Sequence, residues 1–356
     1  MTASSTEPPA LEDQLIEKAI SAAELFSIHI GRELNLYEEL STPRTAGELA
    51  QAAGINPRYG REWLEHQAVG GFVAVDNPDA DPDERAYSLP ARNREVLIDP
   101  DSPLQVGPLA DIIVGVGLVM DRVGDAYRTG DGVPCAAYGR LIREGQANIN
   151  RPAFKHDLTQ SWIPESVPDI HEKLKDGGRV ADVGCGAGWS TIALGRAYPQ
   201  AKVIGFDLDV ASIEDAAANA AAEMVDVAFR AADGAGVARE GPFDLVVILE
   251  ALHDMANPVE VLSNVRSSLA AGGALLVADE LVADRFHPNG DSMERMMYGW
   301  SVIHCLPASM AEPGSAALGT VLRRSMLEEL ARSAGFQSVE TPDVDGGFFR
   351  IYVLKG

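Results

Sequence analysis

Three closely spaced glycines lie between a short apolar run and a segment with helical spacing. They belong to the stretch from Val180 to Trp189, which contains Asp182, Gly184, Cys185, Gly186 and Gly188. Glycine lets the backbone approach a ligand closely, and a helix N-terminus offers it free N–H groups. A tight strand-to-helix turn also favours glycine, so the trio alone is weak evidence. Asp207 ends the next apolar run, at about the 20-residue distance where an acid meets a ribose, and the two features together predict nucleotide-like binding.

The glycine spacing separates two possible ligands. A loop for NAD has two phosphate-facing glycines and a third after two further residues, whereas Gly184, Gly186 and Gly188 are separated by single residues. S-adenosylmethionine has no phosphate, and its amino-acid end and ribose must be held instead. A carboxylate below the loop, at Asp182, can order the loop and help to hold an ammonium group. The pattern favours S-adenosylmethionine.

A histidine follows the candidate strand Phe243–Leu249, within Leu252-His253-Asp254. The carboxyl ends of strands in an open α/β sheet face the ligand crevice, so His253 is expected near a transferring methyl group. A lone histidine is often structural, but this position favours a functional role. A hydroxyl is a poor nucleophile until it loses its proton, and an imidazole that takes this proton accelerates transfer by about 10²–10⁴-fold.

An alternating pattern of strands and helices must position these residues. Strands are predicted at 179–183, 202–207, 225–230, 243–249, 274–279, 338–341 and 348–354, and helices at 189–198, 210–222, 258–270 and 325–334. This alternation predicts an open α/β sheet with helices on both faces. The stretch from Pro103 to about Ile170 is expected to be mostly helical.

The first hundred residues follow a different pattern. One or two helices are expected over 11–40, with a break at Gly31. Thr45 and Glu48 form a capping-box pattern before a helix over 46–53, and a second helix runs from Asn56 to Val69. Two short strands at 72–75 and 86–89 flank an acidic tip. Two helices and a two-stranded wing predict a winged helix.

With these motifs in order, residues 171–356 resemble class I S-adenosylmethionine-dependent methyltransferases. Asp233-Gly234, the strand at Phe243 and the turn at Leu269–Gly273 match further motifs of that family. The resemblance implies a Rossmann-like α/β sheet preceded by an α-helical winged-helix domain, and the product S-adenosylhomocysteine. The cofactor-binding residues it implies are Asp182, Gly184, Cys185, Gly186, Gly188, Asp207, Leu208, Asp233, Gly234 and Leu249.

The His-Asp pair is also similar to that of plant-type small-molecule O-methyltransferases. In that family the matching histidine, here His253, is the general base, and an acid at the end of the fifth strand orients it. Asp279-Glu280 stands there, and Glu280 is the better match. A second family acid is replaced by Thr320-Val321-Leu322. The N-terminal half resembles the dimerisation domain of those enzymes and, more closely, a bacterial winged-helix methyltransferase group, which implies a homodimer.

The resemblance implies four segments and a place for the acceptor. The segments are a disordered leader (1–10), a winged-helix dimerisation domain (11–100), a helical linker and substrate cap (101–170) and the methyltransferase domain (171–356) with a substrate-side insert (280–322). Met and aromatic residues at helical spacing usually pack in a core. Their place in this insert nevertheless suggests an apolar acceptor pocket made by Tyr138, Trp162, Met297 and Trp300.

Composition and charge narrow the classes of partner. The 356 residues carry a formal charge of −24, which repels nucleic acid on average. Arg58 and Arg61 in the second winged helix stand beside Glu62 and Glu65, and the wing tip is acidic, which also argues against DNA binding. The three cysteines have no zinc spacing, and no acid pair of a magnesium site adjoins His253, so no metal is expected.

The sequence also gives expectations for the cellular location of the protein and for its reaction. The N-terminus has no signal-peptide pattern, and the longest apolar run, 112–120, is too short to cross a bilayer, so we expect a cytoplasmic protein. The first hypothesis is O-methylation of a small, apolar hydroxylated compound. The alternatives are N- or C-methylation by proximity without a base, or a winged-helix transcriptional regulator with S-adenosylmethionine as effector.

Overall fold

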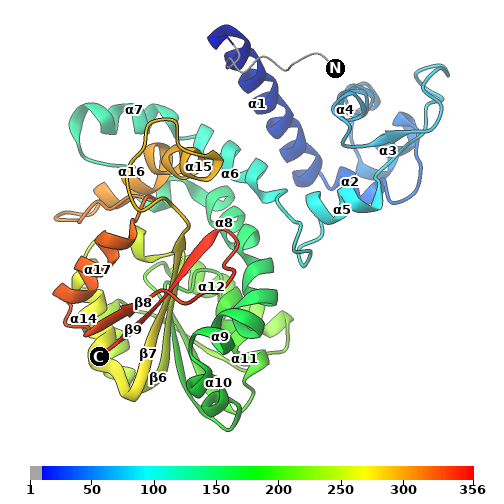
Figure 1. Cartoon of the computed structure of the whole chain (residues 1–356). Helices are drawn as coiled ribbons and strands as arrows, with labels where there is room; N and C mark the ends of the chain where they lie inside the picture. Colours follow the sequence, from blue (N-terminus) through cyan, green and yellow to red (C-terminus); the bar gives the residue numbers. More distant parts are fainter. Residues whose placement is uncertain (1–9) are drawn as a thin grey trace, which may run out of the picture. The chain divides into compact units, whose positions relative to one another are not determined.

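The computed structural model describes residues 10–356 and divides into two units (Figure 1). One unit ends at Val114, and the other runs from Gly115 to Gly356. Residues 1–9 of the expected leader lie outside the described residues.

The N-terminal unit has the expected winged-helix order. Its elements are α1 (Leu11–Glu33), α2 (Leu36–Glu39), α3 (Ala46–Ala53), α4 (Pro57–Val69), β1 (Ala74–Val75), β2 (Tyr87–Ser88) and α5 (Ala91–Leu97), and α6 (Pro108–Gly117) spans the boundary. The capping box predicted for α3 is present, because Thr45 Oγ1 accepts from the Glu48 N–H and Glu48 Oε2 accepts from the Thr45 N–H at 2.8 Å. Gly54, at φ +68°, ends the helix.

The break expected at Gly31 is wrong. Gly31 lies inside α1, and the chain turns at Asn35, whose φ is +54°. A Cβ on Gly31 would lie 2.5 Å from the Trp63 ring and 2.6 Å from the Tyr37 ring. Glycine is therefore needed here for the close approach of two rings to the helix and not for a turn.

The second unit contains a seven-stranded sheet in the order β5-β4-β3-β6-β7-β9-β8. All neighbours are parallel except β9, which runs antiparallel to β7 and β8. The strands are β3 (Gly178–Val183), β4 (Ala201–Asp207), β5 (Ala228–Ala231), β6 (Phe243–Leu249), β7 (Leu269–Glu280), β8 (Ser338–Glu340) and β9 (Phe349–Lys355). All seven predicted strands are present. β6 has the predicted ends, and the ends of the other six are shifted by one to several residues.

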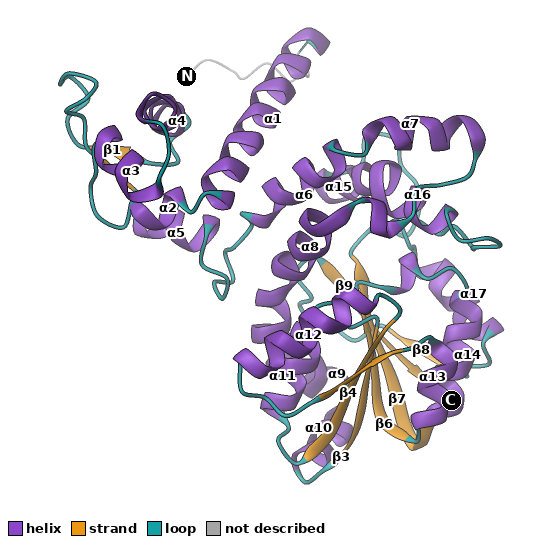
Figure 2. Cartoon of the chain, turned by 180° about the vertical axis from the view of Figure 1, so that it is seen from behind, coloured by secondary structure: helices purple, strands orange, loops and turns teal. Residues whose placement is uncertain are grey.

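Helices cover both faces of this sheet, and other helices of the unit lie beyond one end of its strands, as Figure 2 shows. They are α7 (Met120–Thr129), η1 (Cys135–Ala137), α8 (Gly139–Ala153), η2 (Phe154–Trp162), α9 (Ile163–Ser166), α10 (Pro168–Lys175), α11 (Trp189–Ala197), α12 (Val210–Ala222), α13 (Gly234–Glu240), η3 (Leu252–Asp254), α14 (Pro258–Ser268), α15 (Ser292–Trp300), η4 (Ser301–Cys305), α16 (Leu306–Met310) and α17 (Arg324–Ser333). The sequence pattern missed α13, a short helix that starts at a glycine.

Two apolar cores hold the sheet between its helices. Alternate residues of β6 point to opposite faces, so Leu245 and Val247 pack with η2, α9, α10 and α11, whereas Val246 and Ile248 pack with α13, α14 and α17. Both faces are thus anchored, and the parallel order brings the carboxyl ends of β3, β4, β6 and β7 to one edge. That edge positions the candidate site.

Candidate active site

The glycine loop joins β3 to α11 in a conformation that needs its glycines. Gly184, Gly186 and Gly188 have φ of +78°, +50° and +82°. A Cβ would lie 2.7 Å from the Ala251 side chain at Gly184, and 2.8 Å from the Phe229 ring at Gly188. At Gly186 nothing lies within 4 Å, so the backbone there faces open space. The loop therefore has a bare surface on which a ligand can lie.

Asp182 lies buried beneath this loop at 1% exposure. Its Oδ2 accepts hydrogen bonds of 2.6 Å from both the Ser190 and Thr191 hydroxyls at the start of α11. Its Oδ1 is buried with no hydrogen-bond partner among the described residues. Burial raises the pKa of Asp182 to about 6 although the two hydroxyls oppose it. An unsatisfied carboxylate oxygen at this place fits the ammonium group of a bound amino acid.

Asp207 ties the end of β4 to the glycine loop. Its Oδ2 accepts from the Gly186 N–H at 2.8 Å, and its Oδ1 accepts from the Asp209 N–H at 2.9 Å. Burial raises the pKa of this carboxyl. Each carboxylate oxygen can accept more than one hydrogen bond, so Asp207 can hold the loop and a ribose hydroxyl together.

The other residues expected to contact the cofactor differ in exposure and in their hydrogen bonds. Asp233 is the N-cap of α13 and accepts from the Gly236 N–H at 3.0 Å, so its side chain has a structural role of its own. Leu208 is 74% exposed, whereas Cys185, Gly234 and Leu249 are buried. Their contacts with a cofactor stay predictions.

His253 is fully buried just beyond β6, in the short helix η3. Its Nδ1 lies 3.0 Å from Asp279 Oδ1, at the end of the neighbouring strand β7. A carboxylate can only accept, so Nδ1 carries the proton and neutral His253 has its lone pair on Nε2. This Nε2 has no hydrogen-bond partner among the described residues. The pair therefore fixes the ring and leaves Nε2 without a hydrogen bond, and the expected base role of this nitrogen stays a prediction.

The hydrogen bond to His253 that the sequence pattern placed on Glu280 is made by its neighbour Asp279. Successive side chains of a strand leave on opposite sides, so Asp279 and Glu280 approach His253 from different directions. The orienting role itself stays a prediction. The backbone N–H of Glu280 also donates to Asp279 Oδ1 at 3.1 Å, which fixes the carboxylate. The sequence pattern offered both acids but could not tell which one faces His253.

The electrostatic surroundings favour protonated His253. Burial alone lowers its pKa, but the carboxylates of Asp279 and Asp254 and the Asp279 hydrogen bond outweigh burial, and the pKa lies well above its ordinary value. Asp254 Oδ1 lies 3.6 Å from Nε2. The basic form of His253 thus becomes more populated as the pH rises.

Two further acids join this group, and the sequence pattern gave only one of them. Glu250 directly follows β6 with a φ of +52° and accepts a hydrogen bond from the Asn150 amide in α8. Glu280 is 5% exposed. Glu250, His253 and Glu280 each have a polar atom within 4.8 Å of the others. The position of Glu250 directly after a predicted strand could have indicated that it belongs to the site. Nothing in the sequence around Asn150 indicated that it would contact Glu250.

Comparison with known proteins identifies the second unit. Residues 174–319 match the family model described as a methyltransferase domain. This part of the chain is a methyltransferase domain. Residues 22–98 match the model described as an Rv2258c-like winged HTH domain, which confirms the predicted winged helix.

Similarity to individual proteins extends over different shares of the chain. Trans-aconitate 2-methyltransferase of Methylobacterium nodulans is 36% identical over 99 residues, 28% of this chain and 37% of that protein. Ubiquinone biosynthesis O-methyltransferase of Caulobacter sp. (strain K31) is 32% identical over 105 residues, 29% of this chain and 41% of that protein. The chain thus matches only about two fifths of these relatives. Human N-acetylserotonin methyltransferase, solved in complex with SAM, has a TM-score of 0.67 and 18% identity, with 99% of both chains covered. This likeness shows the fold.

The expected acceptor pocket of the methyltransferase domain is only partly assembled. Tyr138 is buried, its hydroxyl donates to the Ile303 carbonyl at 3.1 Å, and its ring packs edge-on against His304. This contact joins the helical region to the insert. Met297 is buried in α15, and Trp300 at the end of that helix is half-buried. These positions are compatible with an acceptor pocket, which stays a prediction.

Trp162 does not belong to that pocket. It is fully buried, its ring packs against Phe349 of β9 at 5.7 Å, and its Nε1 donates to the Asp345 carbonyl. The π-helical turn η2 directs this side chain toward the sheet. Trp162 is therefore a core residue of the second unit.

The absence of a metal, expected from the sequence, stays a prediction. Two groups of three residues offer donor atoms within 4.8 Å of one another, namely Glu250, His253 and Glu280, and His253, Asp254 and Cys305. The cysteines at 135, 185 and 305 are free thiols. Among the described residues, no helix has both the length and the apolar character to cross a membrane.

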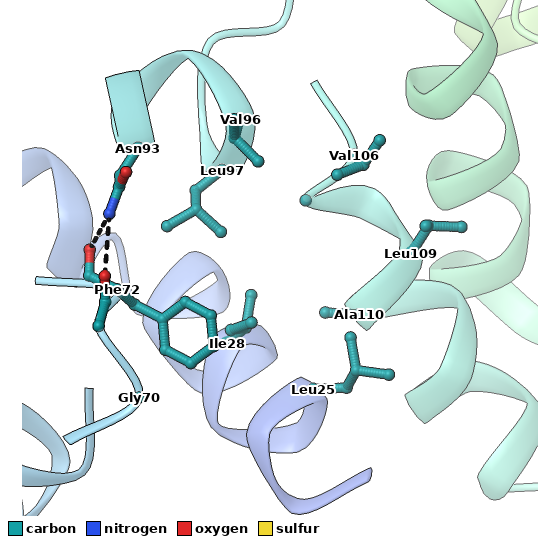
Figure 3. A pocket seen from close by; sticks show the side chains of 12 residues that line it. Leu25, Ile28, Gly70, Phe72, Asn93, Val96, Leu97, Val106, Leu109 and Ala110 are labelled. Carbon is teal, nitrogen blue, oxygen red and sulfur yellow. Dashed lines mark hydrogen bonds between the residues drawn. The ribbon is translucent and has the colours of Figure 1, made fainter. Parts of the chain in front are cut away.

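The N-terminal unit has an apolar cavity of about 350 Å³ (Figure 3). Leu25 and Ile28 of α1, Phe72, and Leu109 at the start of α6 face into it. Asn93 lies at its border and donates to the carbonyls of Gly71 and Phe72. No titratable side chain lines this cavity, so it offers no chemistry of its own.

Proposed function

We propose that this protein is an S-adenosylmethionine-dependent methyltransferase that acts on a hydroxyl of a small, apolar acceptor, with His253 as the general base. The observation that carries the proposal is the buried His253–Asp279 pair at the carboxyl ends of β6 and β7, on the sheet edge that also holds the glycine loop. The methyltransferase domain and the SAM-bound human neighbour of the same fold support it.

The residues have separate roles in this proposal. S-adenosylmethionine supplies an activated methyl group and leaves as S-adenosylhomocysteine. Asp182 holds the ammonium group, and Asp207 holds the ribose while it fixes the loop. Nε2 of His253 takes the proton of the acceptor hydroxyl as the oxygen attacks the methyl carbon, and Asp279 holds the ring in the required tautomer. Alignment of the reacting atoms adds to the rate.

The winged helix serves in this proposal for dimer formation and not for DNA binding. The arginines that would face DNA are engaged by acids, since Arg58 pairs with Glu62 and Arg61 lies 3.3 Å from Asp83. Acids beside these arginines weaken the phosphate contacts that dominate DNA affinity, although exposed ion pairs of this kind contribute only about 0–1 kcal/mol.

The test combines binding and turnover. Calorimetric titration of the full chain with S-adenosylhomocysteine is expected to give saturable binding, and labelled S-adenosylmethionine is expected to methylate a phenol or hydroxy-lipid in an acceptor panel. His253→Ala should lower kcat on that acceptor by about 10²–10⁴-fold. His287→Ala, which changes an exposed histidine of the same domain, should not. A His253→Ala variant that keeps most of the rate would instead favour N- or C-methylation by proximity.

A further inference from the structure

Two glutamates face each other where β6 and β7 end. Glu250 follows the last residue of β6, and Glu280 is the last residue of β7. Each has a carboxylate oxygen within 4.8 Å of the other and of a ring nitrogen of His253. The pair therefore lies beside the group that the proposed reaction uses as its base.

One of these carboxylates lacks a hydrogen-bond donor. Glu280 is 95% buried, and its Oε2 has no partner among the described residues. Glu250 accepts from the Asn150 amide, which holds its carboxylate in place. A buried acceptor without a donor is costly, so a ligand that donates here gains binding free energy.

The charge balance of the group indicates a positive ligand. The charges that act most strongly on Glu280 are the carboxylates of Glu250, Asp279 and Asp254, with His253 as the one opposing group among them. Burial raises the pKa of Glu250 to about 7, and burial together with the neighbouring acids raises the pKa of Glu280 well above its ordinary value. A bound cation would offset the repulsion among these carboxylates and favour their charged forms.

The two carboxylates are close enough for one ammonium group to reach both. A nitrogen that donates to two oxygens at about 2.8 Å in tetrahedral directions reaches oxygens about 4.6 Å apart, and bends to reach closer ones; the oxygens of this group lie within 4.8 Å of one another. We propose that Glu250 and Glu280 together bind a protonated amine of the methyl acceptor, beside the hydroxyl that faces His253. This inference rests on the proposed function and narrows the acceptor to a small hydroxylated compound whose apolar part also carries a protonated amine.

The test uses two probes that differ in one group. Phenylethanolamine carries a hydroxyl and a protonated amine, and phenylethylene glycol has a neutral hydroxyl in place of the amine. Calorimetry on the full chain should find the amine bound at least about tenfold more tightly than the glycol, as expected for one charge-assisted hydrogen bond. Glu250→Gln and Glu280→Gln should each remove this preference, whereas Glu260→Gln, an exposed carboxyl on α14, should keep it.

Other outcomes of these experiments would overturn the inference, and one would refute the proposed function. Equal affinity of wild type for the two probes overturns the inference without any variant, and so does a preference that survives both Glu→Gln changes. If Mn²⁺ or Zn²⁺ alone raises the melting temperature of wild type but not of the variants, and the amine preference is absent, the acids hold a metal. If the variants lose only the preference for S-adenosylmethionine over S-adenosylhomocysteine, the cation is the sulfonium. Failure to bind S-adenosylhomocysteine would refute the proposed function separately.

Discussion

At the scale of single residues, Asp279 controls both the orientation and the proton affinity of His253. Its carboxylate is fully buried and accepts from Nδ1, and its charge is the strongest of those that raise the pKa of His253. A base must be neutral to act, so activity is expected to rise with pH through this raised pKa. Asp254, the Cys305 thiol, His304, Glu250 and Glu280 are further titratable groups around it.

Replacement of Asp279 should therefore change the pH profile as well as the rate. Asp279→Asn removes the negative charge, which lowers the pKa of His253 and moves the rising limb of kcat/KM to lower pH. Loss of the carboxylate also permits the wrong tautomer, so kcat should fall by about 10²-fold or more. Steady-state rates across pH check both effects. A lower rate with an unchanged limb would indicate a merely structural role for Asp279.

At the scale of elements, two glycine variants can distinguish the backbone strain of an added side chain from its effect on ligand binding. Gly186 and Gly272 both have positive φ and nothing within 4 Å of an added Cβ. Gly186→Ala and Gly272→Ala should therefore cost similar backbone strain, about 1–2 kcal/mol. Only the Gly186 change places a methyl group on the bare surface of the loop, so it alone should weaken S-adenosylhomocysteine binding, by about tenfold in calorimetry. Equal affinities of the two variants for S-adenosylhomocysteine would show that the ligand does not lie on this surface.

In the winged-helix unit, a glycine is needed because two aromatic rings pack directly against it, whereas nothing packs against Gly186. Gly31→Ala places a methyl group 2.5 Å from Trp63 and 2.6 Å from Tyr37, and such overpacking should destabilise the N-terminal unit by about 1–3 kcal/mol. Gly47→Ala in α3 meets nothing within 4 Å and should be neutral or stabilising by up to about 1 kcal/mol. Hydrogen exchange of α1 and α4 amides under mild denaturant measures the two effects. Equal protection in both variants would contradict the packing argument.

At the scale of the whole molecule, α1 leaves an apolar stripe exposed. The helix buries Ile28 and Gly31 and exposes six large apolar side chains, those of Leu11, Leu15, Ile16, Ile20, Phe26 and Ile30. Contiguous exposed apolar residues are typical of an interface. This stripe supports the expected homodimer, with a second copy of the chain as its occupant.

The dimer prediction is tested by charge on that stripe. Ile16→Glu together with Ile20→Glu should convert a dimer into a monomer, as measured by light scattering after size-exclusion chromatography. Ser21→Glu, on the opposite side of the same helix, should leave the dimer intact. A wild-type chain that is monomeric at micromolar concentration would refute the expectation.

Local patterns in the sequence determined the elements because their causes are local. The capping box at Thr45, the apolar run of β6 and the glycines after β3 each act within a few residues, and the structure has the predicted element at each place. The match of residues 174–319 to a methyltransferase domain agrees with the motif order.

Tertiary structure alone decided which side chains meet. Asp279 and not Glu280 makes the hydrogen bond with His253, Trp162 packs in the core, and Asn150 reaches Glu250 across 100 positions of sequence. Side-chain direction at a strand end and the approach of distant helices depend on how the whole sheet is covered, because the same residue types fit either arrangement locally. Spacing along the chain therefore predicts which strand end carries the chemistry, and packing selects the partners.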